Sequence, residues 1–278
     1  MKRFHYILLI LSVSYFGLGI ILLIRILQEK PPLYSARGKW TLVWEDDFNG
    51  SALDRNKWVL GDQSCGYNGS QIEIRSISQE NIAVKNGCLT LADNNFFRKD
   101  PTSLNYSICF ISGRVSTSDK YTWRYGRFEV RAKLPEGEGL LSEAGLQTVR
   151  GSSREIHMMM MSGQDLFTVF MNNRWGADRL NHYWQENDFS RNFTDFSKGF
   201  HNFAIEWEPQ NIRWYVDNNE IYRTNQNVPD QPLSLTLGTS AGNLYLLYLT
   251  SNFSGKAFTL PDLPKYFIID WVRVYQRR

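Results

Sequence analysis

The sequence predicts an all-β domain of the sandwich or barrel type, preceded by one N-terminal membrane helix. After residue 30 the chain consists of short apolar or alternating runs separated by Gly, Asn, Asp and Pro. No long stretch beyond that point has the 3.6-residue period of a helix. About ten or more strands at this spacing are typical of sandwiches and barrels. Nothing repeats at a fixed period, so we expect a single domain over residues 40–278.

The N-terminal segment predicts a signal-anchor over residues 1–30. Residues 6–24 carry no charge and are rich in Leu and Ile, and at about 1.5 Å per residue they nearly span a hydrocarbon core of about 30 Å. The apolar run continues past the small-residue site Gly17–Gly19, which favours an uncleaved anchor over a cleaved signal peptide and secretion. Pro31-Pro32 then opens a linker over residues 31–39. We expect a single-pass membrane protein with its domain in the secretory lumen or outside the cell.

The strands are predicted from runs of β-forming residues. Residues 128–134 alternate between apolar and polar side chains, as in a half-buried strand. Residues 268–275 are dense in β-branched and aromatic side chains. In chain order we expect strands within Trp40–Trp44, Ile82–Val84, Cys88–Leu91, Ile108–Ile111, Gly126–Leu134, Leu166–Met171, Phe203–Trp207, Ile212–Val216, Leu244–Leu249 and Phe267–Tyr275.

The composition excludes several classes of protein. Hydrophobic residues make up 42% of the chain, enough for a core, so wholesale disorder is excluded. The net charge of +3 arises in the first 30 residues, and the balanced remainder has no basic run, which argues against nucleic-acid binding. The four histidines lie far apart, so we expect no metal site. One disulfide can form in three ways among Cys65, Cys88 and Cys109.

Asn-X-Ser/Thr triplets indicate possible N-glycosylation. They agree with a lumenal or extracellular domain, and they begin at Asn49, Asn68, Asn105, Asn192 and Asn252.

Several strings, in order along the chain, resemble glycoside hydrolase family 16, the laminarinase- and lichenase-like β-glucanases and glucan-recognition proteins. They include Trp44–Gly50, Ser112–Arg114, Trp123–Glu129, Arg213–Asp217 and Asp270–Gln276. The resemblance covers about residues 40–276 and rests on the order and spacing of these strings together. It implies a concanavalin A-like jelly-roll β-sandwich with an open concave cleft, suited to a polysaccharide such as β-1,3-glucan or another surface glycan.

The resemblance also implies where catalytic groups belong. The family carries two glutamates on one strand, as Glu-x-Asp-x-x-Glu with a bulge or Glu-x-Asp-x-Glu without one. Here Glu155 stands at the nucleophile position and His157 replaces the middle Asp. The acid/base position is Met160 if the bulge is kept and Met159 if it is not. Because a thioether cannot transfer a catalytic proton, the site is expected to be inactive or severely impaired.

Other positions of the expected cleft have changed as well. The family's sugar-stacking tryptophans are replaced by Leu141–Gly145, and Arg174 stands where a histidine is expected. A structural calcium ion is possible at Asp270, which matches a calcium-binding position in some relatives; no other cofactor is expected. The candidate substrate-binding residues are Trp123, Arg127, Trp175 and Trp184, with core or rim packing as the alternative for the tryptophans.

Three function hypotheses remain open from the sequence. The leading one is a membrane-anchored, non-catalytic or barely catalytic homologue that binds β-glucan-type carbohydrate. The second is an active endo-β-glucanase with Glu138, Glu143 or His157 as an unusual proton donor. The third is a structural or adhesion domain without sugar binding.

Overall fold

The computed structural model describes most of the domain. The residues described are 40–61, 72–77, 79–99, 106–149, 154–176, 182–184, 190–191, 194–241 and 262–277. The predicted anchor at residues 6–24, the linker at 31–39 and the predicted strand Leu244–Leu249 lie outside them. Within the described residues, no helix is long and apolar enough to cross a membrane.

Two β-sheets make up the described fold, and the only helix among these residues is the 3-10 turn η1 (Gln79–Asn81). The ten-stranded sheet contains, in spatial order, β16 (Asn219–Thr224), β15 (Asn211–Val216), β14 (His201–Glu208), β8 (Gly126–Lys133), β18 (Lys265–Arg277), β5 (Cys88–Lys99), β6 (Tyr106–Ser112) and β3 (Ile72–Ile77), with β1 (Trp40–Asp46) on β18 and β4 (Ile82–Lys85) on β5. The eight-stranded sheet contains β12 (His182–Trp184), β11 (Thr168–Gly176), β10 (Arg154–Ser162), β9 (Leu140–Gln147), β17 (Ser234–Ala241), β7 (Arg114–Ser116) and β2 (Val59–Leu60), with β13 (Ser190–Arg191) on β11.

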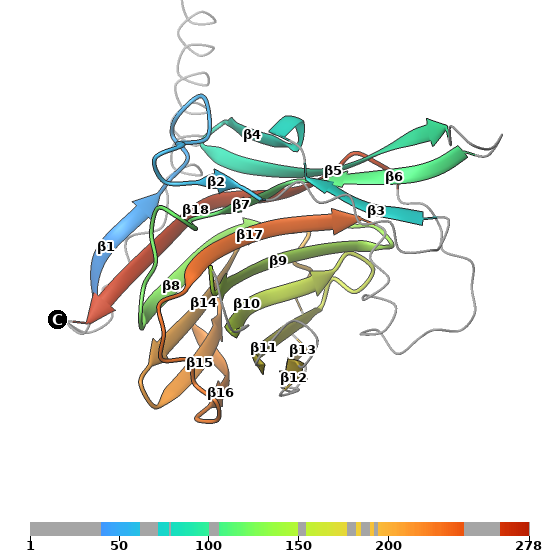
Figure 1. The fold of residues 1–278 in the computed structure, drawn as a ribbon. Helices are drawn as coiled ribbons and strands as arrows, with labels where there is room; N and C mark the ends of the chain where they lie inside the picture. Colours follow the sequence, from blue (N-terminus) through green and yellow to red (C-terminus); the bar gives the residue numbers. More distant parts are fainter. Residues whose placement is uncertain are drawn as a thin grey trace, which may run out of the picture. The chain divides into compact units, whose positions relative to one another are not determined.

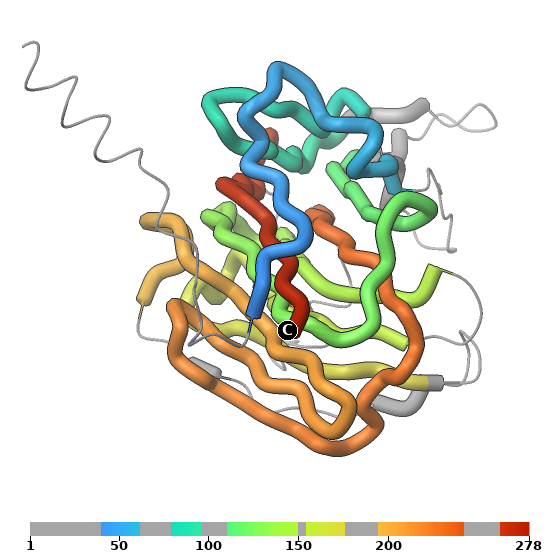
Figure 2. The backbone as a smooth tube through the Cα atoms, turned by 90° about the vertical axis from the view of Figure 1, so that its left-hand side faces the viewer, coloured from blue at the N-terminus to red at the C-terminus, as the bar shows by residue number. Residues whose placement is uncertain are grey.

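The pairing is antiparallel throughout the described strands except between β3 and β6. In the ten-stranded sheet, strands that are far apart in sequence pair directly. The N-terminal β1 and the C-terminal β18 run side by side, as the blue and red segments of Figure 2 show. The inner faces of the two sheets share one hydrophobic core, with Phe128 and Val272 from one sheet and Leu146 and Ile156 from the other. The prediction of an all-β sandwich is therefore confirmed.

The core is closed at one edge by the first of the strings singled out above. The carboxylate of Asp46 accepts a hydrogen bond from the indole Nε1 of Trp58 (2.7 Å) and another from the backbone N–H of Phe48 (3.0 Å). Trp58 is fully buried and packs against Trp44 with their ring centroids 5.5 Å apart. This string therefore serves the scaffold, because its acid and its tryptophans hold the segment after β1 against the core.

A buried acid joins the two sheets. Asp93 on β5 has no exposed surface, and its carboxyl accepts hydrogen bonds from Ser112 on β6 (2.6 Å) and from Thr239 on β17 of the other sheet (2.5 Å). Burial raises the pKa of Asp93 from 3.8 to about 7, and the two hydroxyl donors offset only part of this increase.

We expect Asp93→Asn to remove a pH-dependent loss of stability. The folded chain keeps the Asp93 proton up to about pH 7, whereas the unfolded chain releases it near pH 3.8. Between these values the folded state binds more protons, so this residue lowers the free energy of unfolding as pH rises, by at most about 1.4 kcal/mol per pH unit. Urea denaturation of both proteins from pH 5 to pH 8 tests this: the difference should grow in favour of Asp93→Asn. Parallel pH curves for the two proteins would contradict the expectation.

Candidate functional site

A β-bulge on β10 decides which methionine joins Glu155 on the outer face of the eight-stranded sheet, the face turned away from the core. The register between β10 and β9 shifts between His157, which pairs with Gly145, and Met159, which pairs with Ala144. Position 160 then pairs with Glu143 on β9 and with Phe170 on β11. Because the bulge restores the alternation, Met160 lies on the outer face with Glu155 and His157.

The other three methionines of the run belong to the core. Met158, Met159 and Met161 are at most 1% exposed and pack in the core shared by the two sheets. Met160 belongs instead to a separate small cluster with Leu141 and Phe170. The alternative in which Met159 occupies the acid/base position requires an unbulged strand and is therefore wrong.

Glu155 is held by two basic side chains on neighbouring positions. Its Oε2 atom lies 3.1 Å from Nε2 of His157 and accepts a hydrogen bond of 3.1 Å from a terminal nitrogen of Arg174, which pairs with Glu155 across β10 and β11. Burial alone raises the pKa of Glu155, but the hydrogen bonds and positive charges of His157 and Arg174 outweigh burial and lower it to about 2. Glu155 is therefore a carboxylate at any physiological pH.

The backbone of His157 is fixed from the opposite sheet. Its carbonyl oxygen accepts a hydrogen bond of 2.8 Å from the indole Nε1 of Trp214, which is buried on β15. The contact anchors the bulged part of β10 from below and keeps the side chain of His157 on the outer face beside Glu155.

The side chains that pack against Met160 are apolar and cannot transfer a proton. Met160 is 3% exposed and its cluster partners Leu141 and Phe170 are 5% and 7% exposed. These apolar side chains surround the position on the outer face at which the resemblance places the acid/base. The site thus combines a permanently charged carboxylate with an apolar surface at the position of its expected partner.

Of the two glutamates considered as alternative donors, only Glu143 faces the same region. Glu143 lies directly opposite Met160 across β9 and β10, and opposite Gly238 on its other side. Its carboxylate leans over Gly238 to form an ion pair of 2.8 Å with Arg114 on β7, away from β10. Glu138 lies nine residues from Gln147, the β9 partner of Glu155, which is about 30 Å of extended chain. Glu138 is therefore too far from Glu155 to act with it.

Two of the predicted substrate-binding residues make contacts within the scaffold. Arg127 on β8 is 1% exposed and forms ion pairs with Glu129 (2.7 Å) and Glu206 (3.0 Å) in the ten-stranded sheet. Trp123 bridges to the core residue Leu233 and packs edge-on against Phe128, with ring centroids 5.9 Å apart. The prediction for Arg127 is wrong, because this side chain is buried in the other sheet. Trp123 is only partly buried, and its role in substrate binding stays a prediction.

The other two tryptophans lie near Arg174. Trp175 pairs with Arg154, and the alternation along β11 places it on the core side of the sheet, opposite to the side of Arg174. Trp175 is partly exposed there, and its role in substrate binding stays a prediction. Trp184 pairs with Arg174 in the register of β12 and β11. Its role in substrate binding stays a prediction.

Arg114 and Arg174 are the functional candidates that sequence reasoning did not identify. Arg114 was visible only as part of the Ser112–Arg114 string, and Arg174 only as a replacement for an expected histidine. The strand register, which brings Arg114 to Glu143 and Arg174 to Glu155, cannot be read from either string alone.

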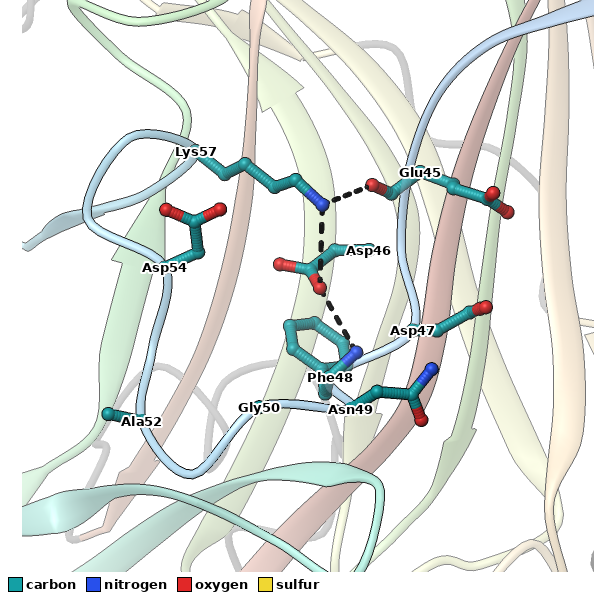
Figure 3. Close-up of a pocket in the computed structure, with 9 residues that line it drawn as sticks. All are labelled: Glu45, Asp46, Asp47, Phe48, Asn49, Gly50, Ala52, Asp54 and Lys57. Carbon is teal, nitrogen blue, oxygen red and sulfur yellow. Dashed lines mark hydrogen bonds and ion pairs between the residues drawn. The ribbon is translucent and has the colours of Figure 1, made fainter.

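A pocket away from the outer face surrounds the turn after β1. It is lined by residues of the segment 45–57, among them Asp46, Asp47, Asn49 and Lys57 (Figure 3). Lys57 reaches across it to the carbonyl oxygen of Glu45 (2.7 Å) and to the carboxylate of Asp46 (3.7 Å). Asn49 is exposed at this turn, so the predicted acceptor there is accessible. The acceptors Asn68, Asn105, Asn192 and Asn252 lie outside the described residues.

The residues around Asp270 do not fit a calcium ion. The guanidinium of Arg131 forms an ion pair with the carboxylate of Asp270, so a cation of the protein itself already occupies that position. Among the residues described in the structure, no group of three or more His, Cys, Asp or Glu side chains is arranged to hold a metal.

Comparison with known proteins agrees with this arrangement. The model of the family "Glycosyl hydrolases family 16" matches residues 69–257, which is more than half of the chain. Among curated proteins, a glucan endo-1,3-beta-glucosidase A1 from Niallia circulans is 28% identical over 266 residues, covering 85% of this chain and 38% of that protein. This chain thus spans about two fifths of the length of that relative.

Solved structures agree in fold. The laminarinase catalytic domain from Thermotoga maritima MSB8 superposes with a TM-score of 0.68 at 25% identity, covering 86% of this chain and 98% of that one. The endo-beta-1,3-glucanase from Pyrococcus furiosus superposes with a TM-score of 0.70 at 22% identity, covering 90% of this chain and 99% of that one, and shows a likeness in fold.

Proposed function

Because the chain belongs to glycosyl hydrolase family 16, we propose that the outer face of its eight-stranded sheet binds β-glucan-type carbohydrate and hydrolyses it very slowly or not at all. The name of the Niallia relative supports a glucan as the ligand, since it describes an enzyme acting on 1,3-linked β-glucan. The proposal describes a carbohydrate-binding homologue of an enzyme family, with the scaffold kept and the chemistry lost.

The single observation that carries the proposal is the place of Met160. The bulge of β10 puts this side chain on the row of the outer face where the resemblance places the acid/base, and Leu141 and Phe170 pack around it. Proton transfer to the leaving oxygen typically contributes about 10²–10⁴-fold to the rate. A thioether in an apolar cluster cannot replace that contribution.

The surroundings of Glu155 support the same conclusion. A retaining glycosidase needs a second carboxyl group about 5–5.5 Å from its nucleophile. The neighbours of Glu155 are Arg174 and His157, which both bind its Oε2 atom. His157 is thus engaged with the nucleophile position itself, which leaves it unsuited to protonate a leaving group on the far side of the scissile bond.

We extend the proposal to location on the basis of the sequence. The apolar run at residues 6–24 supports a membrane anchor, and the Asn-X-Ser/Thr triplets support a domain in the secretory lumen or outside the cell. The glycan would then be met at a membrane surface.

The proposal predicts that wild type and Glu155→Gln release reducing ends from laminarin and lichenan at the same near-background rate. It also predicts that the wild type binds at least one of these glucans in calorimetry. The full-length chain in detergent is the protein to test, with circular dichroism to verify a β-rich fold. Turnover that is well above background in the wild type and lost in Glu155→Gln would refute impaired catalysis. A folded protein that neither binds nor cleaves would support the structural or adhesion role instead.

One observation favours the second candidate, an active endo-β-glucanase with a relocated donor. Glu143 is the cross-strand neighbour of Met160, and its side chain is 21% exposed on the same face. Its ion pair with Arg114 turns the carboxylate away from β10, which makes this candidate the weaker one. Hydrolysis that depends on both Glu143 and Glu155 would establish it.

A further inference from the structure

One row of residues crosses the outer face of the eight-stranded sheet at the level of Met160. Across neighbouring strands it consists of Arg114 on β7, Gly238 on β17, Glu143 on β9, Met160 on β10 and Phe170 on β11. The half of the row at Met160 and Phe170 is apolar and nearly buried. The other half is polar and accessible, since the side chains of Arg114 and Glu143 are 30% and 21% exposed.

Glycine lets the two charged side chains meet across an intervening strand. A Cβ atom at Gly238 would lie 3.3 Å from Oε1 of Glu143 and 3.4 Å from Cγ of Arg114, so both side chains cross the sheet directly above this residue. On the other side of Arg114, a Cβ atom at Gly61 would lie 3.0–3.1 Å from the arginine's own Cβ, Cγ and Cδ atoms. The pair therefore lies close to the sheet, spanning Gly238 and with Gly61 beside Arg114.

The pair has hydrogen-bonding capacity left over. A guanidinium carries five N–H donors and a carboxylate accepts several hydrogen bonds, whereas the contact between Arg114 and Glu143 is one of 2.8 Å between a terminal nitrogen and Oε1. In the part of the chain that the structure describes, neither side chain has another hydrogen-bond or ion-pair partner. Donors and acceptors thus remain side by side, while the charges of the two groups cancel.

We propose that the Arg114–Glu143 pair is a saccharide subsite that recognises two adjacent hydroxyl groups of a neutral sugar ring. One hydroxyl donates to the carboxylate of Glu143 while its neighbour accepts from the guanidinium of Arg114. The cancelled charge argues against an anionic ligand, whose acid groups would compete with Glu143 for Arg114. The inference rests on the proposed function and deepens it. It has hydrogen bonds from Arg114 and Glu143 hold the sugar in the part of the outer face where the family's stacking tryptophans are replaced.

The proposal selects between linkages. An internal 4-linked glucosyl residue keeps its neighbouring 2- and 3-hydroxyls free. An internal 3-linked residue has no adjacent free pair, because its 3-oxygen is part of the glycosidic bond. We therefore assign the subsite to a 4-linked glucosyl residue, such as those of mixed-linkage β-glucan, in preference to an internal residue of a purely 3-linked chain.

Calorimetry with cellotetraose and laminaritetraose on the full-length protein tests this assignment. We expect the wild type to bind cellotetraose more tightly than laminaritetraose. Arg114→Ala and Glu143→Ala should each weaken the binding of cellotetraose by about 10- to 100-fold, which corresponds to the free energy of hydrogen bonds to charged groups. Gly238→Ala keeps both charges and displaces the side chains by only a few tenths of an ångström, so it should weaken cellotetraose binding less than either of these variants. The matched control is Arg223→Ala, which removes an arginine from an exposed pair with Glu220 on the other sheet. Thermal unfolding midpoints close to that of the wild type show that each variant is folded.

The outcomes separate this inference from the function on which it rests. A wild type that binds neither tetrasaccharide overturns the proposed function, and this subsite with it. A wild type that binds cellotetraose while folded Arg114→Ala and Glu143→Ala bind it equally well overturns the subsite alone. Tighter binding of laminaritetraose by the wild type, lost to the same degree in both variants, overturns the assignment to an internal 4-linked residue.

Discussion

Met160→Glu is expected to give the protein a β-glucan hydrolase activity about 10²–10⁴-fold above that of the wild type. The substitution places a carboxyl group on the face and in the row where the bulge of β10 holds Met160, beyond the retained carboxylate of Glu155. Its neighbours there are Leu141 and Phe170, and an apolar environment raises the pKa of a carboxyl group, which suits a general acid. Release of reducing ends from laminarin and lichenan measures the gain.

Three controls make this expectation specific. Met160→Gln has the same shape without a titrating proton and should stay at background. Met159→Glu adds the same carboxyl group one residue earlier, but this side chain is fully buried in the core, so the variant should lose stability and gain no activity. Adding Glu155→Gln to Met160→Glu should abolish the new activity. A folded Met160→Glu protein at the background rate would show that more than the proton donor has been lost.

Arg127→Ala is expected to lower the free energy of unfolding by about 3–5 kcal/mol. Arg127 is 1% exposed and donates hydrogen bonds to Glu129 (2.7 Å) and Glu206 (3.0 Å). The substitution leaves both carboxylates buried without their common cation, and it also removes the guanidinium that lies 5.0 Å from the ring centroid of Tyr215. Urea denaturation measures the loss.

Sugar binding distinguishes this scaffold role from the substrate-binding role that the sequence had predicted for Arg127. Below its unfolding transition, Arg127→Ala should bind glucan as the wild type does. The matched stability control is Arg223→Ala, whose side chain is 67% exposed in its pair with Glu220, and which should cost no more than about 1 kcal/mol. A stable Arg127→Ala protein with weakened glucan binding would contradict the scaffold role and show that Arg127 takes part in binding.

Strand prediction succeeded in dense runs of apolar residues and failed where charged or small residues on the outer face interrupt such runs. The runs around Phe203–Trp207 and Ile212–Val216 lie in β14 and β15. By contrast, β9 and β17 were missed because their outer-face positions hold Glu143, Gly145, Thr236 and Gly238, which are charged or small. The strand at 128–134 was expected to be half-buried, but Glu129 is only 4% exposed, because ion pairs on its polar face replace solvent.

The sequence by itself determined the all-β class, the membership of family 16 and the presence of methionine where the resemblance places the acid/base, because each depends on residue types and their order along the chain. Only the tertiary structure decided that Met160, and not Met159, faces outward, since a bulge is a property of strand pairing. The same holds for the pairs Arg174–Glu155 and Arg114–Glu143, and for the burial of Arg127. These contacts join strands that are far apart in sequence, and their partners follow from the register between strands.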